Sequence, residues 1–269
     1  MIEVRNLAYS YHKNQPVLKG IDFSLQDGEI LAIAGRNGTG KTTVTRLLMG
    51  LLQPEQGTIC FQGRDAAKVS VAERARMLGY VFQNPDRQLF ANTVLEEAEY
   101  APLQLGCDPA SARQQAAAAL DGVGLLAMAK KSPQLLSRGQ KQRLTIASAL
   151  AAEPKVLILD EPTSGQDCRE RTHLLRLMRS LNQKGMAILL VTHDMDIIAE
   201  HADRMLVLAD GGIGFCGTPA ELFADEAKTC ALGLELPESV RISRELDLPL
   251  CLTPSEIYGV LERRTGTHA

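Results

Sequence analysis

Short apolar runs alternate with polar turns over the first 82 residues of the chain, at residues 2–7, 21–25, 30–34, 58–61 and 78–82. Runs of this length, bounded by turn residues, are typical of strands. Between residues 156 and 217 strands and helices alternate again, and residues 169–184 carry the leucine spacing of an amphipathic helix. This alternation predicts an α/β fold with a mostly parallel sheet flanked by helices.

The middle of the chain has a different composition. Residues 84–152 are dominated by helix-forming residues, for example at 110–120, and predict a helical subdomain. A chain of 269 residues with 45% hydrophobic content can bury one large core and add a small appendix. We therefore expect a main domain over residues 1–220 and a short C-terminal extension over residues 221–269, too small for a core of its own.

Composition argues against several classes of protein. The net charge of −3 gives no general attraction to nucleic acid, and 4% aromatic residues without tryptophan argue against a base-stacking surface. The six cysteines are scattered without a Cys-x-x-Cys pair, so neither a zinc site nor a disulfide framework is expected. The start of the chain lacks the basic and apolar regions of a secretory leader, and apolar runs fall well short of the roughly 20 residues that cross a bilayer.

Residues 35–42 read Gly-Arg-Asn-Gly-Thr-Gly-Lys-Thr, which is a phosphate-binding motif. It lies between the predicted strand at residues 30–34 and a predicted helix at residues 41–49. Glycines at this turn leave backbone N–H groups open to phosphate oxygens, and the helix N-terminus favours an anion. A plain Gly-rich turn or a dinucleotide-binding motif is the alternative, but Gly-Lys-Thr after a four-residue spacer favours a P-loop for ATP. The residues expected to bind the nucleotide are Gly35, Asn37, Gly38, Thr39, Gly40, Lys41, Thr42 and Thr43.

The motif assigns different tasks to its side chains. Lys41 is expected to reach the β- and γ-phosphates and to act in catalysis, Thr42 to ligate Mg²⁺, and Thr43 to touch the α-phosphate. A second motif follows the apolar residues 156–159, where two acids end a predicted core strand. Asp160 is expected near the magnesium, and Glu161 is placed to polarise the attacking water as a general base. A solvated Asp-Glu pair in a turn is the alternative.

Residues 136–140 read Leu-Ser-Arg-Gly-Gln and are followed by Lys-Gln-Arg. This segment resembles the signature motif of ATP-binding-cassette (ABC) ATPases, and the resemblance covers residues 1–220. By the same resemblance Gln83 is the Q-loop residue and a magnesium ligand, residues 164–167 are the D-loop, and His193 is the catalytic switch histidine. The resemblance implies a P-loop ABC core with an antiparallel β subdomain.

The resemblance also implies a head-to-tail dimer with two composite sites. Ser137, Gly139 and Gln140 of one subunit would then bind the γ-phosphate of the ATP held by the P-loop of the other. The helical composition that follows Gln140 agrees, because an anion is favoured at a helix N-terminus. Tyr11 resembles the aromatic residue that stacks on adenine; Tyr9 is the competing candidate, and alternation would place one of the two in a strand.

Two positions depart from the family pattern. Arg138 replaces the first glycine of the signature motif, and Gln166 occupies a D-loop position that is commonly apolar. Arg138 either points outward or weakens the closed site. All other family residues of the site are present, so ATP hydrolysis is expected.

The segment after Gln83 indicates which subfamily of ABC ATPases the chain resembles. Its Asn-Pro-Asp-Arg-Gln-Leu-Phe sequence resembles the segment of energy-coupling-factor (ECF) ATPases that receives a coupling helix of the membrane protein, with Leu89, Phe90 and Val94 as the expected apolar floor. A plain surface turn is the alternative. ECF ATPases carry a similar C-terminal extension, so residues 238–264 are expected to hold the two subunits together.

The resemblance therefore implies an ATPase subunit that powers an importer of a transition-metal ion (cobalt or nickel) or a vitamin. ATP and Mg²⁺ are its expected cofactors. Its partners would be a second ATPase subunit, identical or paralogous, and a transmembrane coupling subunit, with no nucleic acid. The expected location is peripheral, on the cytoplasmic face of the cell membrane. An ABC ATPase for amino acids or lipoproteins and a non-transport ABC protein are the two rival interpretations; the single copy of each motif argues against the second.

Overall fold

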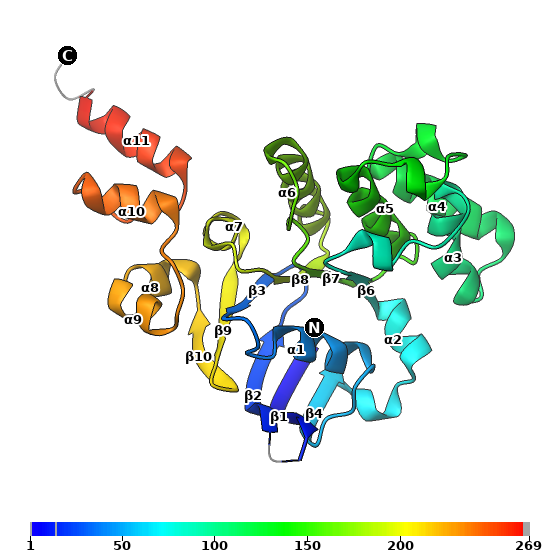
Figure 1. Ribbon diagram of the computed structural model, residues 1–269, viewed down its shortest axis with the longest axis horizontal. Coiled ribbons are helices and arrows are strands. Elements are labelled where there is room, and N and C mark those ends of the chain that lie inside the picture. Colours follow the sequence, from blue (N-terminus) through cyan, green and yellow to red (C-terminus); the bar gives the residue numbers. More distant parts are fainter. Residues whose placement is uncertain (1, 14, 266–269) are drawn as a thin grey trace.

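The computed structural model describes residues 2–13 and 15–265. The central element of the fold is a six-stranded sheet in the order β10-β9-β3-β8-β7-β6 (Figure 1). Every neighbouring pair is parallel except β10 and β9. β3, β7 and β8 are buried along their whole length, which explains why they are continuous apolar runs. The strands are β3 (Ile30–Gly35), β6 (Leu78–Val81), β7 (Val156–Asp160), β8 (Ala187–Val191), β9 (Arg204–Ala209) and β10 (Gly212–Gly217).

A second, antiparallel sheet covers one face of the first. Its order is β2-β1-β4-β5, formed by β1 (Ile2–His12), β2 (Gln15–Leu25), β4 (Gln56–Phe61) and β5 (Arg64–Asp65). The helix α1 (Lys41–Met49) shares one core with both sheets through Val44, Leu47 and Leu48. The antiparallel β subdomain of the expected ABC fold is therefore present, and the P-loop helix lies in the layer between the two sheets.

A helical region lies at one end of the molecule (Figure 1). It contains α3 (Val94–Gln104), α4 (Pro109–Gly122) and α5 (Arg138–Leu150), which pack against one another. The short 3₁₀ turn η2 (Pro85–Arg87) precedes α3, and η3 (Leu126–Met128) and η4 (Pro133–Leu135) lie between α4 and α5. Its core is continuous with the face of the main sheet that α6 (Cys168–Gln183) covers, through Leu144, Leu159 and Leu174. The region is thus attached to the sheet by packing as well as by the chain.

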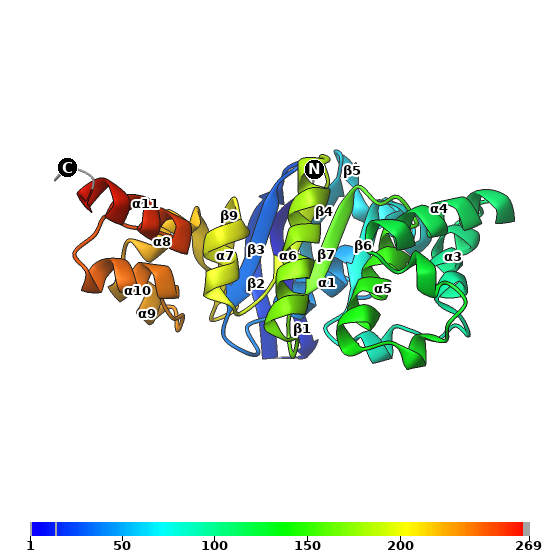
Figure 2. The same ribbon diagram turned by 90° about the horizontal axis from the view of Figure 1, so that it is seen from above.

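The C-terminal helices lie at the opposite end (Figure 2). They are α8 (Pro219–Phe223), α9 (Glu226–Ala231), α10 (Glu238–Glu245) and α11 (Pro254–Thr265). Phe223, Leu234 and Val240 share a buried cluster with Ala32 of β3 and with residues of α7 (Met195–His201). The boundary expected after residue 220 therefore falls inside α8, and residues 222–240 belong to a core shared with the main sheet; residues 266–269 lie outside the described residues.

Several local predictions differ from the structure. The helix α2 (Val71–Met77) was not predicted, although Ser70 and Glu73 form a capping box at its start. The signature helix was predicted to follow Gln140, whereas α5 begins at Arg138. Tyr9 and Tyr11 both lie in β1, where register shifts disturb the simple alternation. Within the described part of the chain, every helix is too short or too polar to span a bilayer.

Candidate functional site

The P-loop connects the carboxyl end of β3 to the first turn of α1. Gly35 has a φ of 139°, and a Cβ there would lie 2.5 Å from the carbonyl oxygen of Leu208. Gly40 precedes α1 with a φ of 101°, and a Cβ there would lie 2.8 Å from Leu18. Only glycine fits these positions, since they combine a positive φ with a close neighbour. The glycines of the motif are therefore required by the turn itself.

Lys41 is the buried cation of this loop, with 8% of its surface exposed. Its Nζ donates to the carbonyl oxygens of Gly35 at 2.7 Å and Arg36 at 3.0 Å. Burial lowers the pKa of Lys41, while the charges of Glu161 and Asp160 act in the opposite direction. The ammonium is thus held inside the loop, where a phosphate anion would find a desolvated positive charge.

Asp160 ends β7 beside the first turn of α1. Its Oδ2 accepts a hydrogen bond of 2.9 Å from the Tyr80 hydroxyl, which in turn contacts Thr45 Oγ1 at 3.1 Å. Burial raises the pKa of Asp160, and hydrogen bonds from Tyr80 and Thr42 oppose that shift. Because the Thr42 hydroxyl and a buried carboxylate lie in hydrogen-bonding contact, their oxygens fit the hard ligands of Mg²⁺. No cluster of three or more His, Cys, Asp or Glu residues occurs in the described residues, so an ion here would need phosphate and water oxygens as further ligands.

Glu161 follows directly, in the left-handed conformation with a φ of 51°. Its backbone N–H donates to Val191 of β8 at 2.8 Å, which ties the turn to the neighbouring strand. Its Oε2 lies 2.7 Å from His193 Nδ1 and accepts a hydrogen bond of 3.2 Å from the Ser164 hydroxyl. The carboxylate thus has a fixed orientation at the carboxyl ends of two adjacent strands.

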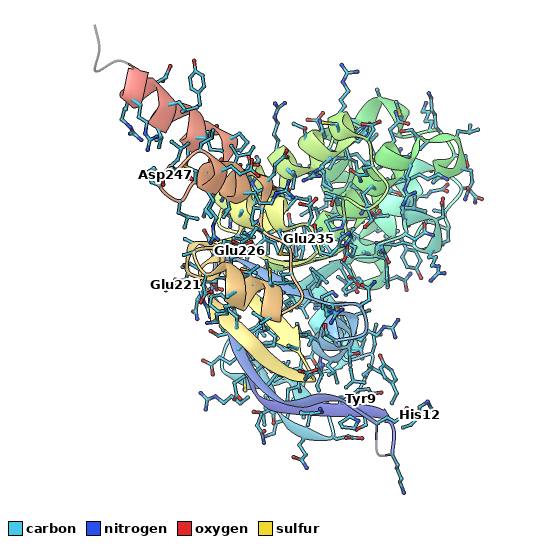
Figure 3. All side chains as sticks on the ribbon, turned by 60° about the vertical axis from the view of Figure 1, so that its left-hand side comes forward. Tyr9, His12, Glu221, Glu226, Glu235 and Asp247 are labelled. Atoms are coloured by element: carbon cyan, nitrogen blue, oxygen red, sulfur yellow. The ribbon has the colours of Figure 1, made fainter. Side chains whose placement is uncertain are left out.

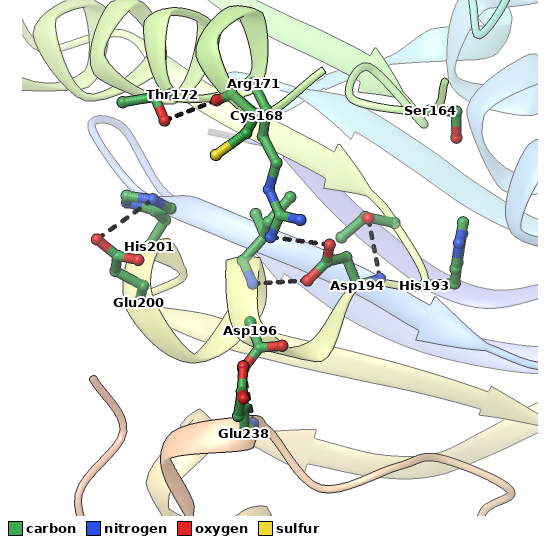
Figure 4. Close-up of polar contacts among 12 residues, drawn as sticks. Ser164, Cys168, Arg171, Thr172, His193, Asp194, Asp196, Glu200, His201 and Glu238 are labelled. Atoms are coloured by element: carbon green, nitrogen blue, oxygen red, sulfur yellow. Dashed lines mark hydrogen bonds and ion pairs between the residues drawn. The ribbon is translucent and has the colours of Figure 1, made fainter. Parts of the chain in front are cut away.

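His193 is anchored through the helix behind it (Figure 4). Asp194 caps α7 by accepting from the backbone of Ile197 at 3.1 Å and forms an ion pair of 2.9 Å with Arg171 of α6. Asp196 accepts from the backbone N–H of Glu238 at 2.7 Å, which joins α7 to α10. The His193 side chain itself is 70% exposed and projects from the turn just before this fixed helix.

Two adjoining cavities contain most of the predicted residues. One, of about 420 Å³, is lined by Tyr11, Asn37, Gly38, Gly40, Lys41, Thr42, Thr43, Gln83, Asp160 and Glu161. The other, of about 640 Å³, is lined by Gly35, Arg36, Asn37, Gln83, Glu161, His193 and the segment 233–236. Thr39 lies on the loop and bonds to Arg36 O at 2.9 Å. Of the two tyrosines, Tyr11 faces the smaller cavity and contacts Thr43 Oγ1 at 3.2 Å, whereas Tyr9 packs against the core.

The signature residues line neither cavity. Ser137 caps α5: its hydroxyl accepts from the N–H of Gln140 at 3.2 Å, and Gln140 Oε1 accepts from the N–H of Ser137 at 2.9 Å. Gly139 is buried against Glu170, and a Cβ there would lie 2.4 Å from the Glu170 carboxyl carbon. The helix tip is therefore rigid and internally capped, and it lies outside the P-loop cavities of its own chain.

The comparisons with known proteins identify the family. The ABC transporter family model matches residues 18–164, which include the P-loop, the signature motif and the two acids at the end of β7. A putative ABC transporter ATP-binding protein of Pyrococcus horikoshii is 41% identical over 261 residues, which are 97% of this chain and 99% of that protein. The chain belongs to the ABC transporter ATPases. It therefore has the ATP-binding and ATP-hydrolysing cassette of that family.

Two further proteins similar to this ABC ATPase bear on its subfamily. The energy-coupling factor transporter ATP-binding protein EcfA of Methanosphaera stadtmanae is 38% identical over 92% of this chain and 90% of its own length. The solved structure of cbiO1 from Clostridium perfringens, part of the ABC transporter complex cbiONQ, has a TM-score of 0.78 and 33% identity, covering 92% of this chain and 98% of that one. Some other relatives are longer, and this chain spans 43% of their length.

Sequence reasoning missed several residues of this ABC ATPase site. Tyr80 of β6 donates a hydrogen bond to Asp160 of β7. The two residues meet because the strands are paired with Tyr80 beside Ile158. Segment 233–236, which contains the Glu235 labelled in Figure 3, lines the larger cavity from the C-terminal extension. Gln166, noted as a departure, donates from Nε2 to the Pro162 carbonyl at 3.0 Å and so braces the D-loop. No sequence pattern signals these contacts.

Proposed function

We propose that this ABC ATPase powers an ECF-type importer of a transition-metal ion, cobalt or nickel, or of a vitamin. The names of the EcfA relative and of the cbiO1 structure support this subfamily. The Asn-Pro-Asp-Arg-Gln-Leu-Phe segment after Gln83 supports it independently. ABC ATPases work as dimers with transmembrane subunits, so the protein is assigned to the cytoplasmic face of the membrane as a peripheral subunit.

The separation of the signature tip from the P-loop is the observation that carries the proposal. One chain holds Lys41, Asp160 and Glu161 around a cavity, while its Ser137 tip contributes to no cavity near them. A helix N-terminus with small residues binds anions well. Glu170, the carboxylate that packs on Gly139 at this tip, is paired with Arg143. A second ATPase subunit, identical or paralogous, would bring its own Ser137, Gly139 and Gln140 against the phosphate held by Lys41. Closure of that dimer is the motion that transport uses.

Within the site, each residue has a task that its position permits. The P-loop N–H groups and Lys41 bind the phosphates, and Tyr11 lies where an adenine ring can stack. Glu161 accepts a hydrogen bond from the attacking water. His193 Nδ1 lies 2.7 Å from the Glu161 carboxylate and orients that carboxylate toward the γ-phosphate. Magnesium bound near Thr42, Asp160 and Gln83 would neutralise charge that develops on the phosphates.

We propose a coupling surface that differs from the one predicted from the sequence. Leu89 and Val94 are buried in the core, so they form no floor for a partner helix. Phe90 is 63% exposed and packs edge-to-face on Tyr100, with ring centroids 4.7 Å apart. Phe82 and Leu103 are exposed as well. An apolar coupling helix of the transmembrane partner would contact these side chains.

The C-terminal helices α10 and α11 are proposed to hold the two ATPase subunits together. Leu246, Leu250 and Tyr258 are large apolar side chains with 49%, 40% and 66% exposure. None of the three belongs to the buried cluster that joins the extension to α7, so these side chains are available for a partner.

Substituting Glu161→Gln tests the hydrolytic core of the proposal. The amide keeps the size of the side chain but cannot accept a proton, so ATP should still bind, the ATP-bound dimer should persist, and turnover should fall at least ~100-fold. The measurements are steady-state phosphate release and the mass in solution with ATP. Undiminished turnover would remove Glu161 from the proposed role, whereas a variant that binds ATP and stays monomeric would remove the composite dimer.

The subfamily needs a separate experiment. Expression with candidate ECF transmembrane subunits, followed by affinity purification, should recover a complex whose ATP hydrolysis drives cobalt, nickel or vitamin uptake into vesicles. Phe90→Asp should abolish recovery of the complex and leave basal hydrolysis unchanged, because Phe90 lines neither ATP cavity. Recovery with an amino acid or lipoprotein transporter instead would favour the rival ABC class.

A further inference from the structure

Arg138 makes an unexpected contact within its own chain. It replaces the first glycine of the signature motif, and its Nη2 donates to the carbonyl oxygen of Ser164 in the D-loop at 2.9 Å. Its guanidinium covers Gly165, where a Cβ would lie 2.6 Å from the Arg138 Cζ. Gly165 also has a φ of 69°, so only glycine gives the arginine this space without strain. The side chain therefore points at the D-loop, away from any phosphate at the helix tip.

The contact continues to the proposed general base. The Ser164 hydroxyl donates to Glu161 Oε2 at 3.2 Å, and the Ser164 backbone N–H donates to the Glu161 carbonyl at 3.2 Å. The same Oε2 lies 2.7 Å from His193 Nδ1. Three consecutive interactions thus connect the start of α5 to the carboxylate and the histidine.

We propose that Arg138 is a positioning residue for Glu161, and that it couples the two ATP sites of the dimer. This inference rests on the proposed head-to-tail arrangement. Arg138 lies between Ser137 and Gly139, which would contact ATP held by the partner, whereas Glu161 acts on ATP held by its own chain. A shift of the helix tip against the partner's ATP moves the Ser164 carbonyl, and with it the hydroxyl that orients Glu161.

A purely structural role for Arg138 is already filled by other contacts. Arg143 of α5 forms an ion pair of 3.0 Å with Glu170 of α6, and Gly139 packs on that same glutamate. Together with the capping box of Ser137 and Gln140, these contacts fix α5 on α6 without Arg138. They also make the first turn rigid, so a displacement of the tip is passed to Arg138 with little loss.

A double-mutant cycle tests the relay. Arg138→Ala and Ser164→Ala should each lower kcat about 5- to 10-fold, the scale of one hydrogen bond, and the double variant should be no slower than either single variant. ATP affinity, measured with Glu161→Gln added to each variant, should change less than about 2-fold because the P-loop is untouched. The Hill coefficient for ATP should fall toward 1 in Arg138→Ala, and Arg138→Lys should restore part of kcat because one donor remains.

Arg176→Ala, an exposed arginine of α6, is the matched control and should leave kcat and the Hill coefficient unchanged. Multiplicative effects of Arg138→Ala and Ser164→Ala, a normal kcat in Arg138→Ala, or an unchanged Hill coefficient would each overturn the relay. These outcomes are distinct from failure of the proposed function, in which the wild-type protein does not dimerise with ATP or does not hydrolyse it.

Discussion

The two halves of the proposed ATP site differ in how completely one chain builds them. The P-loop half has a buried cation, Lys41, a buried carboxylate, Asp160, and a cavity of about 420 Å³ with backbone donors around it. The signature half is an exposed helix tip whose side chains, Ser137 and Gln140, satisfy each other and line no cavity with the P-loop. The first half is organised for a ligand within the monomer, and the second, in the proposed dimer, would meet a ligand that another chain brings.

This difference has an energetic reason. Desolvated charges such as Lys41 are stable only inside a folded network, so the phosphate-binding half must be built completely by one chain. A helix tip needs only its cap and its dipole, both of which are local, and can therefore wait at the surface. In the proposed dimer, catalysis can then depend on closure, since ATP would bind to one half and react only when the other arrives.

Lys41→Ala should have the largest effect, since it removes the cation of the built half. Loss of two charge-assisted hydrogen bonds, at about 2 kcal/mol each, should weaken ATP binding about 1000-fold. Isothermal titration with a slowly hydrolysed ATP analogue measures this. Lys68→Ala, an exposed lysine outside both cavities, should bind normally. A loss below about 10-fold would mean that backbone donors alone account for phosphate binding.

Ser137→Asp changes the signature half without removing its cap. Aspartate is as good an N-cap as serine, so α5 should remain folded, but its charge repels the γ-phosphate and should lower turnover about 100-fold. ATP affinity of the monomer should stay unchanged. Mixing this variant with Lys41→Ala should restore activity, because each heterodimer has one intact composite site. Roughly a quarter of wild-type turnover is expected from random pairing. Two inactive variants that stay inactive when mixed would contradict the head-to-tail arrangement.

Charges on the extension should separate dimerisation from nucleotide chemistry. Leu246→Glu, directly after α10, together with Tyr258→Glu on α11 places carboxylates at positions that are proposed to meet a second subunit, and should weaken the ATP-free dimer about 10-fold or more. Sedimentation over a range of concentrations measures it. Val71→Glu, at a similarly exposed apolar position on α2, is the control. An unchanged mass distribution would assign the dimer contacts elsewhere.

The same contrast explains what the sequence could reveal. The bounds of α1 were predicted correctly, because glycines at positions 40 and 50 begin and end it. The core strand at residues 156–159 was also predicted, because the apolar run of β7 is fully buried. These are local signals. The contact of segment 233–236 with the P-loop, the Tyr80–Asp160 bond and the turn of Arg138 toward Ser164 depend on tertiary packing, and no periodicity encodes them. The burial of Leu89 and Val94 is a related case, because an apolar residue next to a loop reads the same whether it faces the core or a partner.

Tyr80→Phe should have the smallest effect and tests the electrostatics of the built half. The hydroxyl stabilises the charged form of Asp160, so its loss should raise the pKa of Asp160 further above its ordinary value. Protons then compete with Mg²⁺ at a higher pH than in the wild type. We expect about 3-fold weaker Mg²⁺-dependent nucleotide binding at neutral pH and a larger difference as the pH falls. Tyr100→Phe, which keeps the ring that packs on Phe90, is the control.

The raised pKa also means that the folded state holds the Asp160 proton more tightly than the unfolded state. Without nucleotide, stability should therefore decrease as the pH rises through the folded pKa of Asp160, and this decrease should extend to higher pH in Tyr80→Phe. Identical pH profiles for Tyr80→Phe and the wild type would show that the hydroxyl does not influence the carboxylate.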